Sequence, residues 1–121
     1  MIVGLEGLVR AALDCAADLI TDVLEPSPYK RRLMFRDRSF LDLYLSLSQE
    51  DIYAFHLERR HVDGTILRVD NYPHQRAVRV RSFPHHFHDG QDIQVKESSF
   101  GIVPEEVLTN FLAIIRDRFF H

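Results

Sequence analysis

The sequence predicts an α+β fold in which a helix, an antiparallel β-meander of five to six strands and a second helix follow one another. Apolar residues recur every three or four positions near both ends of the chain, and they alternate with polar residues in the middle. The pairs Asp63-Gly64 and Asp89-Gly90 fall between strand-like segments, where such pairs favour hairpin turns. The length of 121 residues fits a single domain that spans residues 1–121.

The first predicted element is a helix over residues 3–24. Apolar residues from Leu5 to Leu24 follow helical spacing, and three aspartates lie four positions apart on the opposite face. Pro26 and Pro28 are expected to end this helix, because proline cannot continue one.

The middle of the chain changes to a period of two. Leucines alternate with polar residues from Leu41 to Leu47, and Tyr53, Phe55 and Leu57 share one face of the next strand. The strand-like segments, five or six of which are expected to form the sheet, cover residues 29–37, 41–47, 52–60, 65–71, 78–83, 85–88 and 91–95.

The last predicted element is a helix that begins near Val103-Pro104 and runs to Phe119. Proline is favoured in the first helical turn, and the acidic pair Glu105 and Glu106 suits the positive end of the helix. Arg116 and Arg118 are basic residues in the last turn, where the helix dipole is negative.

Charge is unevenly distributed along the chain. Residues 29–88 carry eleven basic and seven acidic groups, whereas the segments before and after are acidic. Thirteen of the fifteen basic residues are arginine, whose planar guanidinium suits phosphate and carboxylate. This pattern is compatible with an RNA or acidic partner, and also with ordinary solvation of exposed strand faces.

One cysteine, Cys15, excludes an intrachain disulfide, and no secretory signal or membrane-spanning run is present in the sequence. A cytoplasmic protein without a membrane association is therefore expected. A chain of this size also leaves room for a stabilising partner or a homodimer. Nucleotide-binding and hydrolase motifs do not occur, and no cofactor is expected.

Four of the seven histidines lie between residues 74 and 88, which marks this segment for chemistry. One interpretation is metal-independent RNA cleavage, in which histidines act as base and acid and a cation stabilises the phosphorane. His86 or His88 would be the base, His74 the acid and Arg79 or Arg81 the stabilising cation. A ribonuclease is thus the enzyme class that these residue types suit.

Three other interpretations stay open. A metal could bind His86 and His88, which point the same way in a strand, with His74 or Asp89 as a third ligand, although no established metal motif occurs. RNA or the ribosome could be bound without cleavage. The aromatic residues offered for base stacking are then Tyr44, Tyr53, Tyr72 and Phe87. Finally, the histidines could satisfy buried polar groups and hold the fold together.

Two motifs in this region resemble those of the TumE-type toxins of prokaryotic toxin–antitoxin systems. Residues 63–74 read DGTILRVDNYPH and residues 83–88 read FPHHFH, in the order and at the spacing of that family. Val69 stands where the family commonly has an aromatic residue. The motif positions carried over from the resemblance are Asp70, Asn71, Pro73, His74, Pro84, His85, His86 and His88.

The resemblance implies a growth-inhibiting cytoplasmic toxin that a separately encoded antitoxin protein neutralises. It also implies interference with translation, by action on RNA or on the ribosome. The assignment of acid and base roles comes from residue chemistry and not from the resemblance.

Overall fold

The computed structural model describes residues 4–46, 48–49, 52–72, 84–91 and 95–121. Within these residues the chain forms two helices and seven strands. In order they are α1 (Leu5–Ala16), β1 (Ile20–Ser27), β2 (Lys30–Phe35), β3 (Phe40–Leu45), β4 (Tyr53–Arg59), β5 (Thr65–Asp70), β6 (His86–Gly90), β7 (Val95–Glu97) and α2 (Pro104–Phe119). The predicted α+β class is confirmed, and the sheet has more strands than the five to six expected.

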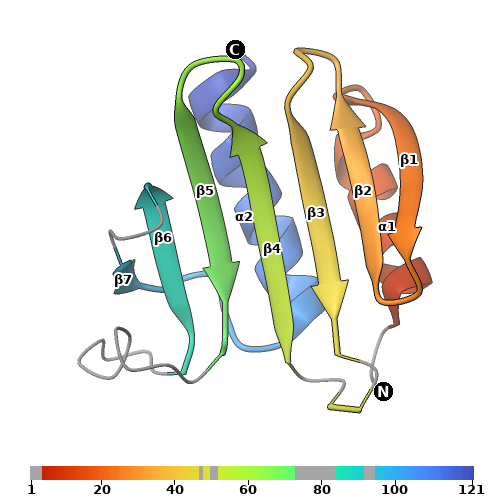
Figure 1. Cartoon of the computed structure of the whole chain (residues 1–121), viewed down its shortest axis with the longest axis vertical. Coiled ribbons are helices and arrows are strands. Elements are labelled where there is room, and N and C mark those ends of the chain that lie inside the picture. The colour runs from red at the N-terminus through yellow and green to blue at the C-terminus, as the bar shows by residue number, and fades with distance from the viewer. Residues whose placement is uncertain (1–3, 47, 50–51, 73–83, 92–94) are drawn as a thin grey trace.

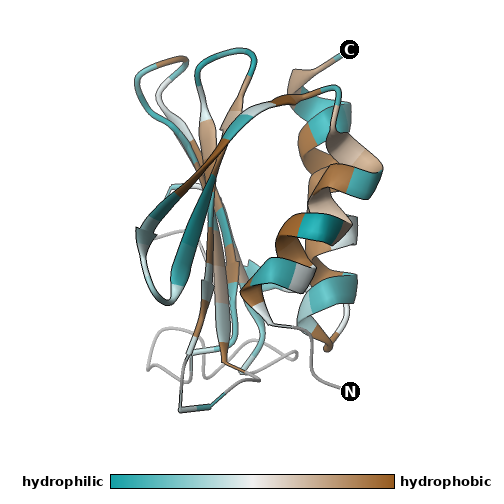
Figure 2. Ribbon diagram, turned by 90° about the vertical axis from the view of Figure 1, so that its right-hand side faces the viewer, coloured by the Kyte–Doolittle hydropathy of each residue, from teal (hydrophilic) through white to brown (hydrophobic). Residues whose placement is uncertain are grey.

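All seven strands form one antiparallel sheet in which each strand pairs with its neighbours in sequence, from β1 at one edge to β7 at the other (Figure 1). Both helices cover the same face of this sheet, as the edge-on view shows (Figure 2). The opposite face carries no helix among the described residues. Side chains that alternate along each strand therefore point either into the helix-covered core or onto an open sheet face.

The core lies between the sheet and the two helices. The alternating apolar residues of β3, β4 and β5 are buried as predicted. Phe87 of β6 packs edge-to-face against Phe111 of α2, and Phe100 contacts both rings. The helices contribute further buried residues to this hydrophobic core: Leu8 and Ala12 from α1, and Val107, Leu108, Leu112 and Ile115 from α2.

The predicted N-terminal helix over residues 3–24 is wrong in its second half. Helix α1 ends at Ala16, and Ile20–Ser27 forms the edge strand β1. This strand pairs with β2, and its register shifts around Thr21 and again between Leu24 and Ser27. Pro26 lies in the second irregularity, where its missing N–H costs no regular ladder hydrogen bond.

The two predicted hairpin turns differ from the expectation. Strands β4 and β5 pair from Arg59 and Thr65 onward, so residues 60–64 form a five-residue loop instead of a two-residue turn. Gly64 has a φ of 82°, which favours glycine, at the end of that loop. Asp89 and Gly90 follow the last pair of β6 with β7, His88 with Val95, but they extend β6 by pairing with Leu67 and Ile66 of β5 instead of forming a tight turn. The predicted strand 78–83 lies outside the described residues.

Helix α2 agrees with the prediction. Pro104 opens it, Glu105 and Glu106 lie in the first turn, and basic residues lie in the last. The end of α2 is joined to the sheet by Arg59, which is 5% exposed at the end of β4. Its guanidinium pairs with Asp37 and Asp63 and lies 3.9 Å from the centre of the Phe119 ring.

Candidate functional site

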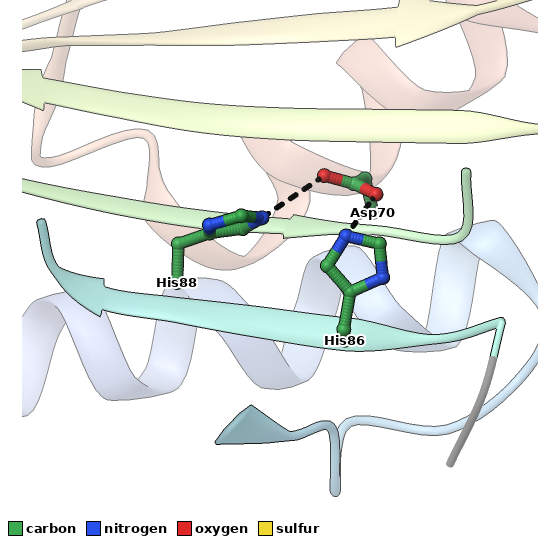
Figure 3. A group of neighbouring side chains, drawn as sticks. All are labelled: Asp70, His86 and His88. Atoms are coloured by element: carbon green, nitrogen blue, oxygen red, sulfur yellow. Dashed lines mark ion pairs between the residues drawn. The ribbon is translucent and has the colours of Figure 1, made fainter. Parts of the chain in front are cut away.

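Asp70, His86 and His88 meet where β5 ends beside β6. Asp70 pairs with His86 and Arg68 pairs with His88 in the strand register, so these four side chains project from the same face. Figure 3 shows both imidazoles turned toward the carboxylate. The interpretation that His86 and His88 point the same way is therefore confirmed.

The Asp70 carboxylate accepts hydrogen bonds on both oxygens. Oδ1 lies 2.7 Å from His86 Nε2 and 3.1 Å from the backbone N–H of Tyr72. Oδ2 lies 2.9 Å from Arg68 Nε and 3.6 Å from His88 Nε2. Asp70 thus connects two strands and fixes the orientation of Arg68, whose side chain is the most exposed of the group.

His86 is fully buried, and both of its ring nitrogens face acceptors. Nδ1 lies 2.9 Å from the Pro84 carbonyl and Nε2 faces Asp70, so a doubly protonated ring donates to both. Burial acts to lower the pKa of His86, but the hydrogen bonds to Asp70 and Pro84 outweigh it and raise that pKa. Burial acts to raise the pKa of Asp70, but hydrogen bonds from His86 and His88 hold it well below the usual range.

A metal ion is the natural alternative occupant of this cluster. One ligand atom from each of Asp70, His86 and His88 lies within 4.8 Å of the others, which would suit a transition metal. In the arrangement seen, however, His86 Nε2 points at an oxygen 2.7 Å away, and Arg68 holds the second carboxylate oxygen. Metal binding would require His86 to lose its Nε2 proton and Asp70 to turn. Asp89, the acidic residue predicted as a third ligand, pairs instead with Lys96 and Arg118.

The motif residues Asn71 and His85 act on the other side of the sheet. Asn71 Oδ1 accepts a hydrogen bond of 2.9 Å from the Tyr53 backbone N–H. The Tyr53 hydroxyl lies 3.0 Å from His85 Nδ1. Burial raises the pKa of Tyr53, and burial with the charge of His86 lowers that of His85, so the hydroxyl donates to a neutral imidazole. These residues tie β4 to the ends of β5 and β6.

The open sheet face next to this cluster is hollowed into a groove of about 510 Å³. His56 of β4 pairs with Arg68 of β5, and Arg68 pairs with His88 of β6, so an arginine lies between two histidines across three strands. We call these three residues the His-Arg-His row. The groove is lined by Lys30, Arg32, Phe40, Asp42, Tyr44, Ala54, His56, Glu58, Arg68 and Tyr72.

The family model described as Toxin TumE matches residues 10–119 of the chain. The chain belongs to the TumE toxin family. It is therefore the toxin component of a toxin–antitoxin system, and the family implies an antitoxin as its partner. No curated protein and no solved structure gives a significant match. Neither helix in the described part of the toxin is long and apolar enough to cross a membrane.

The toxin's predicted site residues fall into three groups. Asp70, His86 and His88 come together, with Pro84 as a hydrogen-bond acceptor, whereas Asn71 and His85 support the core. The predicted residues Pro73, His74, Arg79 and Arg81 lie outside the described residues. Of the aromatic residues predicted to stack bases, Tyr53 and Phe87 are buried in the core, which corrects that prediction.

His56 and Arg68 were not predicted as site residues, although the sequence contains a signal for them. Both occupy polar positions in the alternating pattern of their strands, and the hairpin around Asp63-Gly64 brings those strands together. A two-residue turn at Asp63-Gly64 would have paired Arg68 with Arg59, and it is the five-residue loop that brings His56 opposite Arg68. The arrangement of His56 and Arg68 is thus a property of strand pairing and not of any local motif.

Proposed function

We propose that this toxin inhibits growth by acting on RNA, through metal-independent cleavage on the open sheet face. The observation that supports this most directly is the His-Arg-His row. It combines two imidazoles with a guanidinium on adjacent strands, beside a groove large enough for a nucleotide. These are the residue types that the chemistry needs, although His56 and Arg68 replace some of the residues expected from the sequence.

The proposed reaction begins with attack of a ribose 2′-oxygen on the adjacent phosphorus. One histidine of the row takes the 2′-hydroxyl proton as the new P–O bond forms. The P–O5′ bond breaks, and the other histidine gives its proton to the departing 5′-oxygen. The products are a 2′,3′-cyclic phosphate and a 5′-hydroxyl. Arg68 stabilises the extra negative charge on the phosphorane oxygens.

The spacing of the row is compatible with these roles. Neighbouring strands lie about 4.8 Å apart, so the backbones at His56 and His88 are separated by roughly 10 Å. A phosphate above Arg68 would lie between the two imidazoles. His74, Arg79 and Arg81 remain proposed contributors from the segment outside the described residues.

The buried pair Asp70 and His86 has a positioning role in this proposal. Asp70 binds Arg68 through Nε, and Arg68 is one of the residues that line the groove. His86 holds Asp70 from the other side. We therefore expect substitutions of His86 to act through the placement of Arg68 and His88.

The biological setting follows from the same proposal. RNA and ribosomes are cytoplasmic, so the toxin is placed in the cytoplasm. The antitoxin would neutralise it most simply by covering the open sheet face, which carries the groove. A homodimer is compatible with this arrangement if it leaves the groove accessible.

Cleavage is tested by incubating the purified toxin with total RNA in the presence of EDTA. We expect fragments that end in 2′,3′-cyclic phosphate, and a rate about 100-fold lower in Arg68→Ala and His88→Ala. His121→Ala is the matched control, because His121 is exposed and lies away from the sheet groove. Intact RNA with wild-type toxin would remove the cleavage mechanism, and activity that needs an added metal would favour a metal-dependent enzyme.

The toxin role itself is tested separately by expression of the chain without an antitoxin. Growth arrest is expected, and normal growth at high expression would contradict it. The second candidate function is non-catalytic binding of RNA or protein, and it is supported by the complete burial of His86 and by the structural roles of Asn71 and His85. Growth arrest by wild-type toxin without any RNA cleavage would favour this second candidate.

A further inference from the structure

We propose that the bases of single-stranded RNA stack on Tyr29, Tyr44 and Tyr72, which form a row of rings at one end of the open sheet face. This inference rests on the proposed function, because it takes RNA as the target. It adds the substrate class, which is unpaired RNA, and names the residues that select it. We call these three residues the tyrosine row.

The tyrosine row is assembled from three separate parts of the chain. The rings of Tyr29 and Tyr44 lie edge-to-face, with centroids 5.9 Å apart, and Tyr44 and Tyr72 lie nearly parallel at 6.2 Å. The Tyr72 hydroxyl donates to the Tyr44 hydroxyl at 3.0 Å. Tyr29 is 43% exposed and Tyr72 is 40% exposed. Large aromatic surface thus faces solvent while the ring positions are fixed by mutual contacts.

Such a surface is suited to nucleic-acid bases. Every base has an aromatic face, so stacking on protein rings binds single strands with little sequence preference. Ordering of the rings before binding reduces the entropy lost when the complex forms. The hydrogen bond with Tyr44, together with burial, raises the pKa of Tyr72 to about 12 from its ordinary value near 10, and the hydroxyl is uncharged at neutral pH.

The tyrosine row is connected to the proposed chemistry through the backbone. The N–H of Tyr72 binds Asp70 Oδ1 at 3.1 Å, and Asp70 Oδ2 holds Arg68. A base stacked on Tyr72 would therefore bring a neighbouring phosphate toward Arg68. In a duplex the bases are paired and stacked inside the helix, so only an unpaired strand can make both contacts.

Charge in the groove indicates that stacking, and not phosphate attraction, provides most of the affinity. Three cations, Lys30, Arg32 and Arg68, and two carboxylates, Asp42 and Glu58, line the groove, so its lining carries a single net positive charge with His56 neutral. Arg32 is held by Asp42 through two hydrogen bonds. With a single net positive charge, the slope of log K against log salt should lie between 0 and roughly −2 for a single strand.

The composition of the chain provides a direct optical test. It has no tryptophan and four tyrosines, and the fourth, Tyr53, is fully buried. Quenching of the intrinsic fluorescence by contact with a bound base therefore reports mainly on the tyrosine row. The probe is an eight-nucleotide oligoadenylate with 2′-O-methyl sugars, which lacks the 2′-hydroxyl nucleophile and cannot be cleaved. We expect saturable quenching by this strand and no comparable quenching by the same strand in a duplex.

Variants then locate the binding surface, with affinity measured by anisotropy of the labelled strand. Loss of one stacked base should weaken binding by roughly 5- to 150-fold in Tyr72→Ala or Tyr44→Ala. Tyr72→Phe removes only the hydroxyl and should stay within about twofold of wild type. Ile102→Ala is the control, because Ile102 is 71% exposed and lies outside the groove.

The outcomes separate this inference from the proposed function. Stacking on the tyrosine row would be contradicted by any of three results, each of which leaves RNA as the target. These are unchanged binding of the strand in both alanine variants, equal affinity for a duplex, and a salt slope near −5. RNA cleavage by wild-type toxin, without any change in tyrosine fluorescence when the strand is added, would also contradict stacking on the tyrosine row. If wild-type toxin neither binds nor cleaves RNA but the alanine variants lose the antitoxin, both proposals are wrong and the row is a protein interface.

Discussion

Asp70 influences more of the site than any other described side chain, because a carboxylate with 2% exposure accepts from two strands and from the backbone. The favourable geometry compensates for the desolvation of its charge, which would otherwise be costly at this depth. Removing the acceptor leaves His86 as a buried cation without a counter-ion. The same change releases Arg68 toward the groove.

Asp70→Asn is therefore expected to destabilise the fold by roughly 3–5 kcal/mol, since a buried ion pair loses one partner. Urea unfolding followed by circular dichroism measures this change. Asp42→Asn offers a comparison on the same sheet face. Asp42 pairs with Arg32, whose side chain is 32% exposed, whereas the His86 partner of Asp70 is fully buried. If Asp70→Asn lowers the free energy of unfolding no more than Asp42→Asn does, the charge of Asp70 contributes little to the stability of the fold.

The stability of the fold should depend on pH through the same pair. The raised pKa of His86 contributes stability that is complete below its unfolded value of about 6.5 and is lost as pH rises through the folded pKa. The lowered pKa of Asp70 contributes stability that is complete above about 3.9 and is lost as pH falls. The ion pair of Asp70 and His86 therefore stabilises the fold most between about pH 4 and 6.5. Wild-type toxin should have a higher unfolding free energy than His86→Gln within this pH range, and the difference between the two should shrink at higher pH. A difference that stays constant up to pH 9 would contradict this.

The sequence predicts part of this site and misses part for a physical reason. Strand alternation places His86 and His88 on one face without knowledge of any other residue. The identity of their partner depends on which strand lies beside them, and the connection between Asp70 and Pro84 is too long to set that register from a turn. Asp89 was predicted as a third ligand from proximity in sequence, but it occupies the opposite face of β6 and pairs with Arg118.

At the scale of elements, residues 17–27 show that the spacing of apolar residues does not by itself distinguish a helix from a strand. Leu19, Ile20, Val23 and Leu24 fit a helical stripe, yet β-branched Ile20, Thr21 and Val23 also favour a strand. Pairing with β2 decides between the two, because it supplies backbone partners along one side of β1. Helix α2 was predicted closely, since its first and last turns contain charged residues that match the helix dipole.

Arg59 joins three elements, so its replacement tests how α2 is held at its C-terminal end. In Arg59→Met we expect a loss of about 2–4 kcal/mol, since Asp37 and Asp63 lose their common cation and Phe119 loses a cation contact. Thermal unfolding measures the loss. Arg60→Met is the matched control, because Arg60 is the next residue, is 59% exposed and pairs with Glu58. Equal melting temperatures for the two variants would contradict this role.

At the scale of the whole molecule, composition and periodicity are sufficient for the α+β class and for the order of most elements. They do not place both helices on one sheet face, which depends on the handedness of the connections and on the large apolar side chains of β3 to β5. The groove was likewise beyond prediction, since ten residues from four strands and one loop line it.

Burial across the sheet predicts a gradient of local stability. Strands β3, β4 and β5 are central and paired on both sides, whereas β1 and β7 lie at the edges. Amide hydrogen exchange should therefore be slowest in Leu41–Leu45, Tyr53–Leu57 and Leu67–Val69, and at least about tenfold faster in β1. Equal protection in β1 would indicate that another surface covers that edge in solution.

The meander order determines the sequence in which the core of this toxin can form while the chain is being synthesised. Every strand pairs with the one synthesised just before it, but α2, which covers the core face of the central strands, comes after all of them. From the end of β5 at Asp70 to the end of α2 at Phe119, the ribosome must add 49 more residues. At roughly 5–20 residues per second, that takes about 2–10 seconds. During this interval we expect the nascent sheet to expose the leucines and phenylalanines that pack against α2 in the finished fold.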